Sequence, residues 1–347
     1  MEQITRIFID TSKTFFQLHG VNAAEAAVVR RKLRRSQVLG FFGSLEPTVV
    51  GLEACGASHY WARELARLGH QVKLVAPQHV KAYLRRGKND AADAEAGCEA
   101  MSRPRTWFVP VKSAEQQAAL MLAATRERLV KTRTQLGNAI RGHAAEFGLV
   151  AGRGIDKIEP LLAAIAADEA LPELARELFA DLGREWSRLL QEVRAIDARL
   201  LAWHRANALS RQLAQIPSIG PVGASLLVMK TPDAKAFRSG RHFAAWIGLT
   251  PKDHSTAGKV RLGVITRAGD EALRSTLVAG ATAVIQHVNR GRGLASPWLA
   301  ALLKRKPAKL AAVALANKIA RIAWRLMITG EDYDPRRLMR ALPEKAA

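Results

Sequence analysis

The sequence predicts an α/β domain followed by a mainly α-helical remainder, and a change of pattern along the chain supports this fold class. Up to about residue 105, short apolar runs typical of buried strands alternate with stretches of helical periodicity. From about Ser113 onward, helical periodicity dominates. The chain has 347 residues, of which 48% are hydrophobic, so it is long enough to form more than one core.

The N-terminal region, residues 1–108, has the pattern of a mixed sheet. Three expected strands follow each other closely, and further strands are then separated by a helix. This is the order of the ribonuclease-H-like (RuvC-like) fold, an analogy of fold alone. The expected strands are Thr5–Ile9, Phe15–His19, Val28–Leu33, Thr48–Glu53 and Gln71–Ala76, and the expected helices are Ser36–Leu45, Ser58–Gly69 and Asn89–Met101.

Four carboxylates occupy positions that such a sheet could bring together. Asp10 ends the apolar run IFID, Glu53 ends VVGLE, and Asp90 and Asp93 lie three residues apart, on one helix face. Carboxylate oxygens suit Mg²⁺, with Mn²⁺ as a substitute, and paired ions can stabilise the oxygens of a phosphodiester displacement. The sequence therefore predicts a metal-dependent nuclease site. The alternative is that these acids are solvated surface charges.

The charge balance predicts a polyanionic partner. Lys and Arg number 53 against 31 Asp and Glu, a formal net charge of +22, which favours nucleic acid. No apolar run approaches the roughly 18 residues of a membrane span, and the N-terminus lacks a signal-peptide pattern. We expect no membrane association and a cytoplasmic, nucleoid-associated protein. Cys55 and Cys98 are too few for a disulfide framework or a zinc site.

Two helical arms are expected within residues 109–208, a helical spacer. Leu122, Leu129 and Leu136 follow a heptad in the first arm. Apolar residues in the second arm alternate three and four apart, as in a coiled-coil seam: Trp186, Leu189, Val193, Ile196, Leu200 and Trp203. Both a hairpin within the chain and a dimerising coiled coil fit this pattern.

The C-terminal domain, expected over residues 209–330, contains three candidate nucleic-acid contacts. The segment IPSIGPVGA resembles a helix-hairpin-helix, in which amides near Gly220 and Gly223 could hold a phosphate. In a basic loop, the Ser255 hydroxyl lies among cations that could activate it and bind phosphate, although a turn-forming serine is the simpler reading. The basic residues of these segments are Lys259, Arg261 and Arg267 in the loop, and Lys318, Arg321 and Arg325 on one face of a later helix. Residues 331–347 are expected to form a flexible tail.

Four blocks resemble one family, in the same order: IDTSKTFF, the stretch from GLEACGASHYW to GKNDAADAEA, IPSIGP, and GLTPKDHSTAGKVRLGVITRAGD. The family is the DEDD transposases of bacterial insertion sequences, the IS110 family with its IS1111 subgroup. Its members join a RuvC-like N-terminal domain to a C-terminal transposase domain across a coiled coil. The resemblance extends over residues 3–330.

The resemblance implies roles for particular residues. Asp10, Glu53, Asp90 and Asp93 would be the four acids that bind Mg²⁺, and Ser255 would be a nucleophile that forms a transient phosphoserine bond to DNA. The usual Ser/Thr-Gly-Gly after that serine reads Thr256-Ala257-Gly258 here, which leaves Thr256 as a second candidate. It also implies donor and target DNA as substrates, a guide (bridge) RNA encoded by the element, and a homo-oligomer, from dimer to tetramer.

Two other functions fit parts of the sequence. One is a metal-dependent Holliday-junction nuclease that uses water as its nucleophile, in which Ser255 is structural. The other is a non-catalytic nucleic-acid-binding protein, in which the four acids are ordinary surface charges and metal has no effect.

Overall fold

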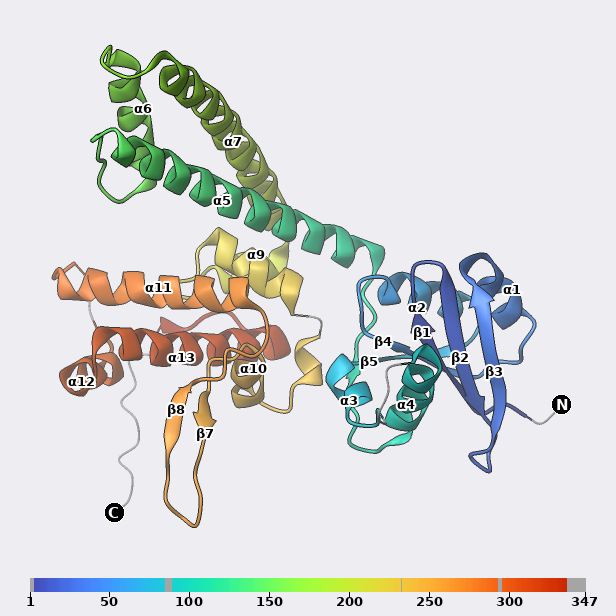
Figure 1. The fold of residues 1–347 in the computed structure, drawn as a ribbon. Coiled ribbons are helices and arrows are strands. Elements are labelled where there is room, and N and C mark those ends of the chain that lie inside the picture. Colours follow the sequence, from blue (N-terminus) through green and yellow to red (C-terminus); the bar gives the residue numbers. More distant parts are fainter. Residues whose placement is uncertain (1–2, 85–88, 232, 293–294, 336–347) are drawn as a thin grey trace. The chain divides into compact units, whose positions relative to one another are not determined.

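The computed structural model describes residues 3–84, 89–231, 233–292 and 295–335. The chain divides into two compact units, Met1–Ala118 and Ala119–Ala347, which are described separately below (Figure 1).

The first unit is built on a mixed six-stranded sheet with the strand order β3-β2-β1-β4-β5-β6. The first three strands form an antiparallel meander, and β4 and β5 continue from β1 in parallel. This confirms the predicted α/β character, and each of the five expected strands is present. The strands are β1 (Arg6–Thr11), β2 (Phe15–Val21), β3 (Ala27–Arg34), β4 (Val49–Glu53), β5 (Gln71–Val75) and β6 (Phe108–Val109).

Helices pack against this sheet through two apolar clusters. One cluster joins strand residues such as Ile9 and Leu52 to Phe42 and Trp61 of the helices that flank β4. The other joins Phe8 to a later helix. The helical segments are η1 (Arg35–Gln37), α1 (Val38–Gly43), α2 (Ser58–Arg67), α3 (Pro77–Lys81) and α4 (Asp90–Ser102). Both α3 and β6 were absent from the sequence prediction, because segments of five and two residues are too short to show a period.

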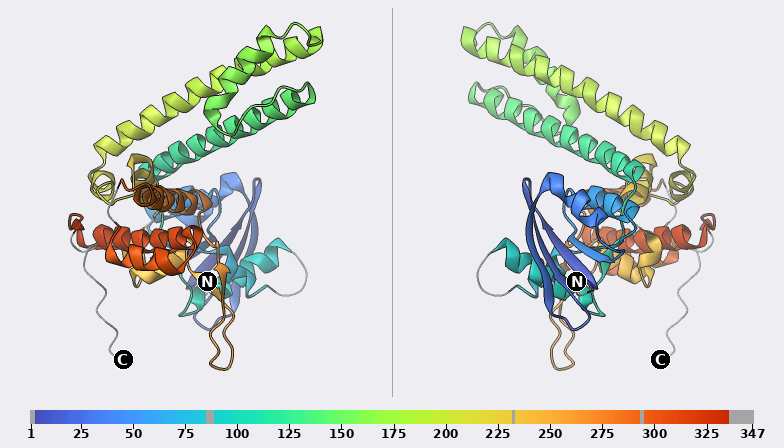
Figure 2. Two further views of the ribbon diagram at one scale, coloured as in Figure 1. Left: turned by 90° about the vertical axis from the view of Figure 1, so that its left-hand side faces the viewer. Right: turned by 90° about the vertical axis from the view of Figure 1, so that its right-hand side faces the viewer.

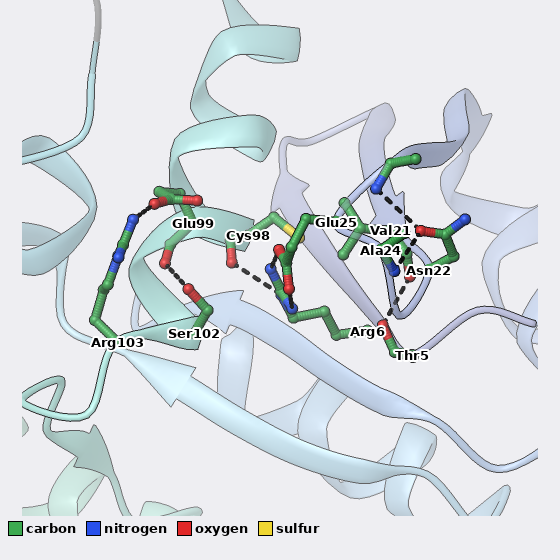
Figure 3. Close-up of polar contacts among 11 residues, drawn as sticks. Thr5, Arg6, Val21, Asn22, Ala24, Glu25, Cys98, Glu99, Ser102 and Arg103 are labelled. Atoms are coloured by element: carbon green, nitrogen blue, oxygen red, sulfur yellow. Dashed lines mark hydrogen bonds and ion pairs between the residues drawn. The ribbon is translucent and has the colours of Figure 1, made fainter.

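Polar contacts hold the C-terminal half of α4 at the end of the sheet where β1 begins (Figure 3). Arg6 Nε donates to the carbonyl oxygen of Cys98 over 3.3 Å. Its guanidinium also forms an ion pair with Glu25 in the β2–β3 turn, and this pairing raises the pKa of Arg6. The hydrogen bond to Cys98 links α4 to the start of β1, and the ion pair with Glu25 holds the Arg6 guanidinium that donates it.

Gly97 allows α4 to lie directly on Phe8 of β1. A methyl group at this position would come within 2.1 Å of the Phe8 ring, which is only 1% exposed. We expect Gly97→Ala to cost about 1–3 kcal/mol, because a packed core yields little to an added carbon. A lower urea midpoint of unfolding would show this.

The matched control is another helical glycine, Gly142, beside which a methyl group meets nothing within 4 Å. Gly142→Ala should leave stability unchanged or raise it by up to about 1 kcal/mol, because alanine has the higher helix propensity. Equal midpoints for the two variants would contradict the tight packing of α4 on β1.

Two long helices and a short one form the arms of the second unit (Figure 2). Residues predicted as the seam, including Leu129, Leu136, Trp186 and Leu189, are buried in one cluster. Arg126 and Asp197 join the arms through an ion pair of 2.6 Å. The seam is therefore covered within the chain, as a hairpin. The helices are α5 (Ala114–Glu146), which begins in the first unit, η2 (Ile155–Lys157), α6 (Ile158–Ala167) and α7 (Glu173–Ala206).

The remainder of the second unit is mainly helical, as predicted, and its core surrounds the last long helix. Small residues such as Ala316 and Ala320 on that helix are fully buried, which lets neighbouring helices approach closely. The elements are α8 (Ala208–Leu213), α9 (Pro221–Lys230), η3 (Ala234–Ala236), α10 (Gly240–Trp246), β7 (Pro251–Asp253), β8 (Leu262–Ile265), α11 (Glu271–Asn289), α12 (Pro297–Arg305) and α13 (Ala308–Thr329).

The start of the expected tail is held against α8. The Gln212 amide donates to the carbonyl oxygens of Gly330 and Glu331, and the Gln215 side chain accepts from the Tyr333 backbone. The rest of the expected tail, residues 336–347, lies outside the described residues. Among the helices that are described, none combines the length and the apolar character needed to cross a bilayer.

Candidate active site

Two of the four predicted acids lie at the same edge of the sheet because their strands are parallel. The register pairs Ile9 of β1 with Leu52 of β4, and Asp10 and Glu53 are the next residue on each strand. Both carboxylates are half-buried. The ends of the two apolar runs therefore meet, as the sequence pattern predicted.

The other two acids lie in the first turn of α4. Asn89 caps this helix, since its side chain accepts a hydrogen bond from the Ala91 backbone over 3.0 Å. Asp90 and Asp93 follow one turn apart, where the helix dipole favours negative charge.

Three of these carboxylates converge. Oxygens of Asp10, Asp90 and Asp93 all lie within 4.8 Å of one another. Within the described ranges, Glu53 does not belong to this closest set, but its charge acts on Asp10 from the neighbouring strand. The structure thus brings together three of the predicted acids tightly and the fourth nearby.

The carboxyl of Asp10 is destabilised in its charged form. Burial is the main cause, followed by the charges of Asp93, Asp90 and Glu53, and together they raise its pKa to about 6. A hydrogen bond from the Thr11 backbone opposes this only in part. Among the described residues, every side-chain charge that contributes to this pKa shift is negative.

This donor set fits a divalent cation. Carboxylate oxygens are the ligands that hard cations such as Mg²⁺ and Mn²⁺ prefer, and a cation would relieve the repulsion that raises the Asp10 pKa. Asp10, Asp90 and Asp93 would hold it, with Glu53 at the adjoining strand end.

The raised pKa of Asp10 gives the metal-free protein a specific pH dependence. Because the folded pKa, about 6, exceeds the ordinary aspartate value of 3.8, this group stabilises the fold below pH 4. That contribution is lost as the pH rises through 6. In EDTA at pH 7, Asp10→Asn should therefore melt at a higher temperature than the wild type, and the difference should vanish near pH 4.

Mn²⁺ should reverse this order at neutral pH. A cation that binds only the folded state adds about 2.7 kcal/mol at a hundred times its Kd. We expect Mn²⁺ to raise the melting temperature of the wild type and to leave Asp10→Asn almost unchanged. Equal shifts in the two proteins, measured by calorimetry, would exclude Asp10 as a ligand.

Ser255 lies beside the tip of the β7–β8 hairpin, in the second unit. Thr256 and Lys259 form a bridge, and the Lys259 backbone N–H donates to the Thr256 carbonyl over 2.9 Å. Ala257 and Gly258 between them have φ of 48° and 78°. Both central residues of this two-residue turn are left-handed, a conformation that favours glycine, so alanine at the first position is a strained choice.

The Ser255 hydroxyl is exposed but oriented by the hairpin. Its oxygen accepts a hydrogen bond from the Arg261 backbone over 3.0 Å. The Ser255 backbone N–H donates to the Asp253 carboxylate over 2.9 Å, and a hydrogen bond from the Ser255 side chain lowers the pKa of Asp253. The sequence reasoning missed Asp253, although the Asp-x-Ser spacing, which is typical of a turn closed by an aspartate side chain, was a visible signal.

The predicted basic residues of this segment have different surroundings. The side chains of Lys259 and Arg261 are exposed on the hairpin. Arg267 lies beyond β8 with φ of 55°, and its backbone N–H donates to the Gly248 carbonyl over 3.3 Å. All three can reach a polyanion without breaking an ion pair formed by the described residues.

The segment predicted to resemble a helix-hairpin-helix joins α8 to α9. Gly220 is the exposed N-cap of α9, followed by Pro221 at the first helical position. Gly223 is buried, and a methyl group there would lie 3.4 Å from Thr276 of α11. Of the two predicted glycines, Gly220 is open to a phosphate, whereas Gly223 provides close packing.

The predicted basic face of α13 is only partly open. Arg321 and Arg325 are exposed, and Arg325 lies 3.7 Å from Glu331. Lys318 is half-buried, with its ammonium 4.4 Å from the centre of the Trp298 ring, and burial lowers its pKa. The exposed positive charge of this face thus comes mainly from the two arginines.

Comparisons with known proteins agree on one family. The model of the transposase IS116/IS110/IS902 family matches residues 210–295, and a DEDD transposase model matches residues 8–147. A Sinorhizobium fredii protein whose name describes it as a transposase is 63% identical, over 96% of this chain and 86% of its own length. The transposase for insertion sequence element IS1111A of Coxiella burnetii is 36% identical, over 96% of this chain and 92% of its own.

Both matched regions contain site residues. The match over residues 8–147 spans the acid cluster, and the match over residues 210–295 spans the hairpin with Ser255. The chain is therefore a DNA transposase that belongs to the IS116/IS110/IS902 family.

Proposed function

We propose that this transposase cleaves and rejoins DNA strands of an insertion sequence in a metal-dependent reaction, through a phosphoserine intermediate at Ser255. The observation that carries the proposal is the convergence of Asp10, Asp90 and Asp93, whose mutual repulsion contributes to the raised pKa of Asp10. A divalent cation bound there would polarise the scissile phosphate and neutralise the charge that develops on it. Glu53, at the adjoining strand end, completes the acidic set.

Ser255 is the nucleophile in this proposal. Its Oγ forms a bond to the scissile phosphorus, the bond from phosphorus to the 3′ oxygen breaks, and the serine proton is released as the 3′ oxygen leaves as a hydroxyl. A 3′-hydroxyl from another strand then attacks the phosphoserine, which restores the serine hydroxyl and joins the strands. No water is consumed, so the bond energy is conserved for rejoining.

Asp253 is a positioning residue for this step. Its hydrogen bonds to Ser255 fix the serine rotamer, but its lowered pKa makes it a weak proton acceptor. We expect Asp253→Ala to slow adduct formation about tenfold to a hundredfold through misorientation of the hydroxyl. Asp253→Asn, which keeps an acceptor oxygen, should lose less.

The readout for Asp253 is the single-turnover rate of adduct formation together with DNA affinity. A positioning role changes the rate and leaves the affinity intact. Identical rates for the alanine and asparagine variants would contradict it.

The basic residues and the helix-hairpin-helix would hold nucleic acid by its backbone. Lys259, Arg261 and Arg267 follow the serine in sequence, and Gly220 leaves the N-terminus of α9 open to a phosphate. Arg321, Arg325 and, to a smaller extent, Lys318 add charge on α13. The resemblance to the family also leads us to propose donor and target DNA as substrates, a bridge RNA from the element as guide, and assembly of the chain into dimers or tetramers.

The direct test is to recover the intermediate. The protein is purified with the RNA expressed from its own element and incubated with DNA that carries the element junction, in Mg²⁺ or in EDTA. We expect a denaturation-resistant protein–DNA adduct in Mg²⁺ only, with the DNA attached to the peptide containing Ser255. Cleavage without an adduct would favour the junction nuclease that uses water. Binding without any response to metal would favour the non-catalytic binder.

A further inference from the structure

A pocket lined by positive charge opens on the first unit, beside the sheet edge that carries the acids. Its volume is about 600 Å³, within the range of sites that bind small ligands. The wall contains three cations, Lys13, Arg34 and Arg35, two aromatic residues, Tyr60 and Trp61, and two hydroxyl residues. None of the lining residues is acidic.

The topology of the sheet places this pocket at the same end of the strands as the acid cluster. Lys13 lies in the turn after β1, three residues past Asp10. Arg34 ends β3, where it pairs with Phe15 at the start of β2. Tyr60 belongs to the first turn of α2, which follows β4 and Glu53. The pocket and the acids therefore occupy the same edge of the sheet.

The three cations are available to an anion. All three are exposed, and the ion pairs formed by the described residues do not include them. The Arg35 guanidinium lies 5.0 Å from the centre of the Trp61 ring, a contact that orients it. Uncompensated cations gathered in one concave surface attract phosphate strongly.

Trp61 supplies an independent indication of a ligand. Its side chain is only 4% exposed, and its Nε1 finds no acceptor within the described part of the chain. A buried indole N–H normally has a hydrogen-bond partner, because leaving it without one costs free energy. This N–H is covered by protein atoms, so a phosphate oxygen bound in the pocket would become its acceptor once the side chains around it move.

Tyr60 indicates which phosphate compound binds. Its ring is 45% exposed and lies edge-on to Trp61, with 5.4 Å between the ring centres. An exposed aromatic ring beside cations is the arrangement that stacks an unpaired base while the backbone is held by charge. A base within a duplex is already stacked and cannot use it.

We infer that this pocket binds the phosphodiester backbone of a single nucleic-acid strand, with one unpaired base stacked on Tyr60. The inference rests on the proposed function for its choice of nucleic acid as the ligand. It adds a strand-holding site on the catalytic unit, separate from the basic residues of the second unit. DNA and RNA share the recognised chemistry, and the experiment distinguishes them.

The test measures binding of full-length protein to labelled single-stranded DNA and to RNA of the same sequence, in EDTA, over a range of salt concentrations. A plot of the logarithm of the association constant against the logarithm of the salt concentration has a slope that counts the phosphate contacts. Arg34→Gln should reduce the magnitude of this slope by about one. Arg67→Gln is the matched control, since it removes an exposed arginine from the far end of α2, and its slope should equal that of the wild type. The strand whose slope changes identifies the ligand as DNA or RNA.

Two further variants test the aromatic residues. Tyr60→Ala should weaken single-strand binding by about five- to 150-fold and leave duplex binding unchanged. Trp61→Phe keeps an aromatic ring beside Phe16 and removes the N–H donor. The smaller ring should lower the melting temperature, so affinity is measured well below that temperature, where single-strand affinity should fall. Unchanged single-strand affinity in both variants would overturn the inference.

The outcomes separate this inference from the proposed function. If Arg34→Gln and Arg67→Gln show the same salt dependence of binding to single-stranded DNA and to RNA, the pocket does not hold a strand. The proposed catalysis is then unaffected. If the Arg34→Gln effect is present but the wild type gives no metal-dependent cleavage, the proposed catalysis fails and the pocket remains a strand-binding site.

Discussion

Asp10→Asn is expected to reduce metal-dependent strand cleavage by at least about 10³-fold, because it removes the carboxylate at the centre of the acid cluster. Asp10 is the residue on which the charges of Asp90, Asp93 and Glu53 act. Asparagine keeps the shape of the side chain, so the loss would report charge and ligation. Cleavage of a junction substrate is measured over a series of Mg²⁺ and Mn²⁺ concentrations.

The control for Asp10→Asn is Glu46→Gln, which neutralises an exposed acid of the same unit outside the cluster. Its cleavage rate should stay within about twofold of the wild type, as is usual for a surface substitution. If Asp10→Asn cleaves as fast as Glu46→Gln at saturating Mg²⁺, the acid cluster is not the metal site of the reaction.

Ser255→Ala is expected to abolish both the protein–DNA adduct and strand rejoining, a loss on the order of 10⁴-fold or more, because no other group replaces a missing nucleophile. The substitution also removes the acceptor for the Arg261 backbone N–H, at a cost of about 1 kcal/mol to the hairpin. Adduct and joined product are measured separately. Mn²⁺ binding, which depends on the first unit, should be unchanged.

Thr256→Ala is the control for the serine, since Thr256 is the neighbouring hydroxyl. Thr256 is held by backbone contacts to Lys259 in the turn, so the hairpin should keep its shape without the threonine side chain. We expect Thr256→Ala to form the adduct at near the wild-type rate. Loss of the adduct in Thr256→Ala and its survival in Ser255→Ala would transfer the nucleophile to Thr256.

The acid cluster was largely predictable from the sequence, for a reason specific to parallel strands. Apolar runs that end in Asp10 and Glu53 place these residues at strand ends, and parallel strands have their carboxyl ends at one edge. The i, i+3 spacing of Asp90 and Asp93 fixed their common helix face. The same reasoning could not predict that Glu53 lies outside the group formed by Asp10, Asp90 and Asp93, because membership of this group depends on distances between side chains.

The orientation of Ser255 was not predictable. The sequence identified the hydroxyl and its basic neighbours, but the hydrogen bond that Ser255 Oγ accepts from the Arg261 backbone exists only because β7 and β8 pair and the turn closes at Ala257 and Gly258. Two strands pair in one register, that is, with particular residues opposite each other. The composition of a four-residue strand such as β8 does not specify which residues these are.

The sequence by itself determined the class of fold, the five main strands, the helical arms and the identity of the acids, because periodicity and strand ends are local properties of the chain. Tertiary structure alone decided that the seam residues of the arms cover each other within one chain and that Gly223 is a packing residue. It also decided that Lys13, Arg34 and Tyr60 line one pocket. These residues come from a turn, a strand end and a helix, and only the folding of the sheet brings such distant segments to one edge.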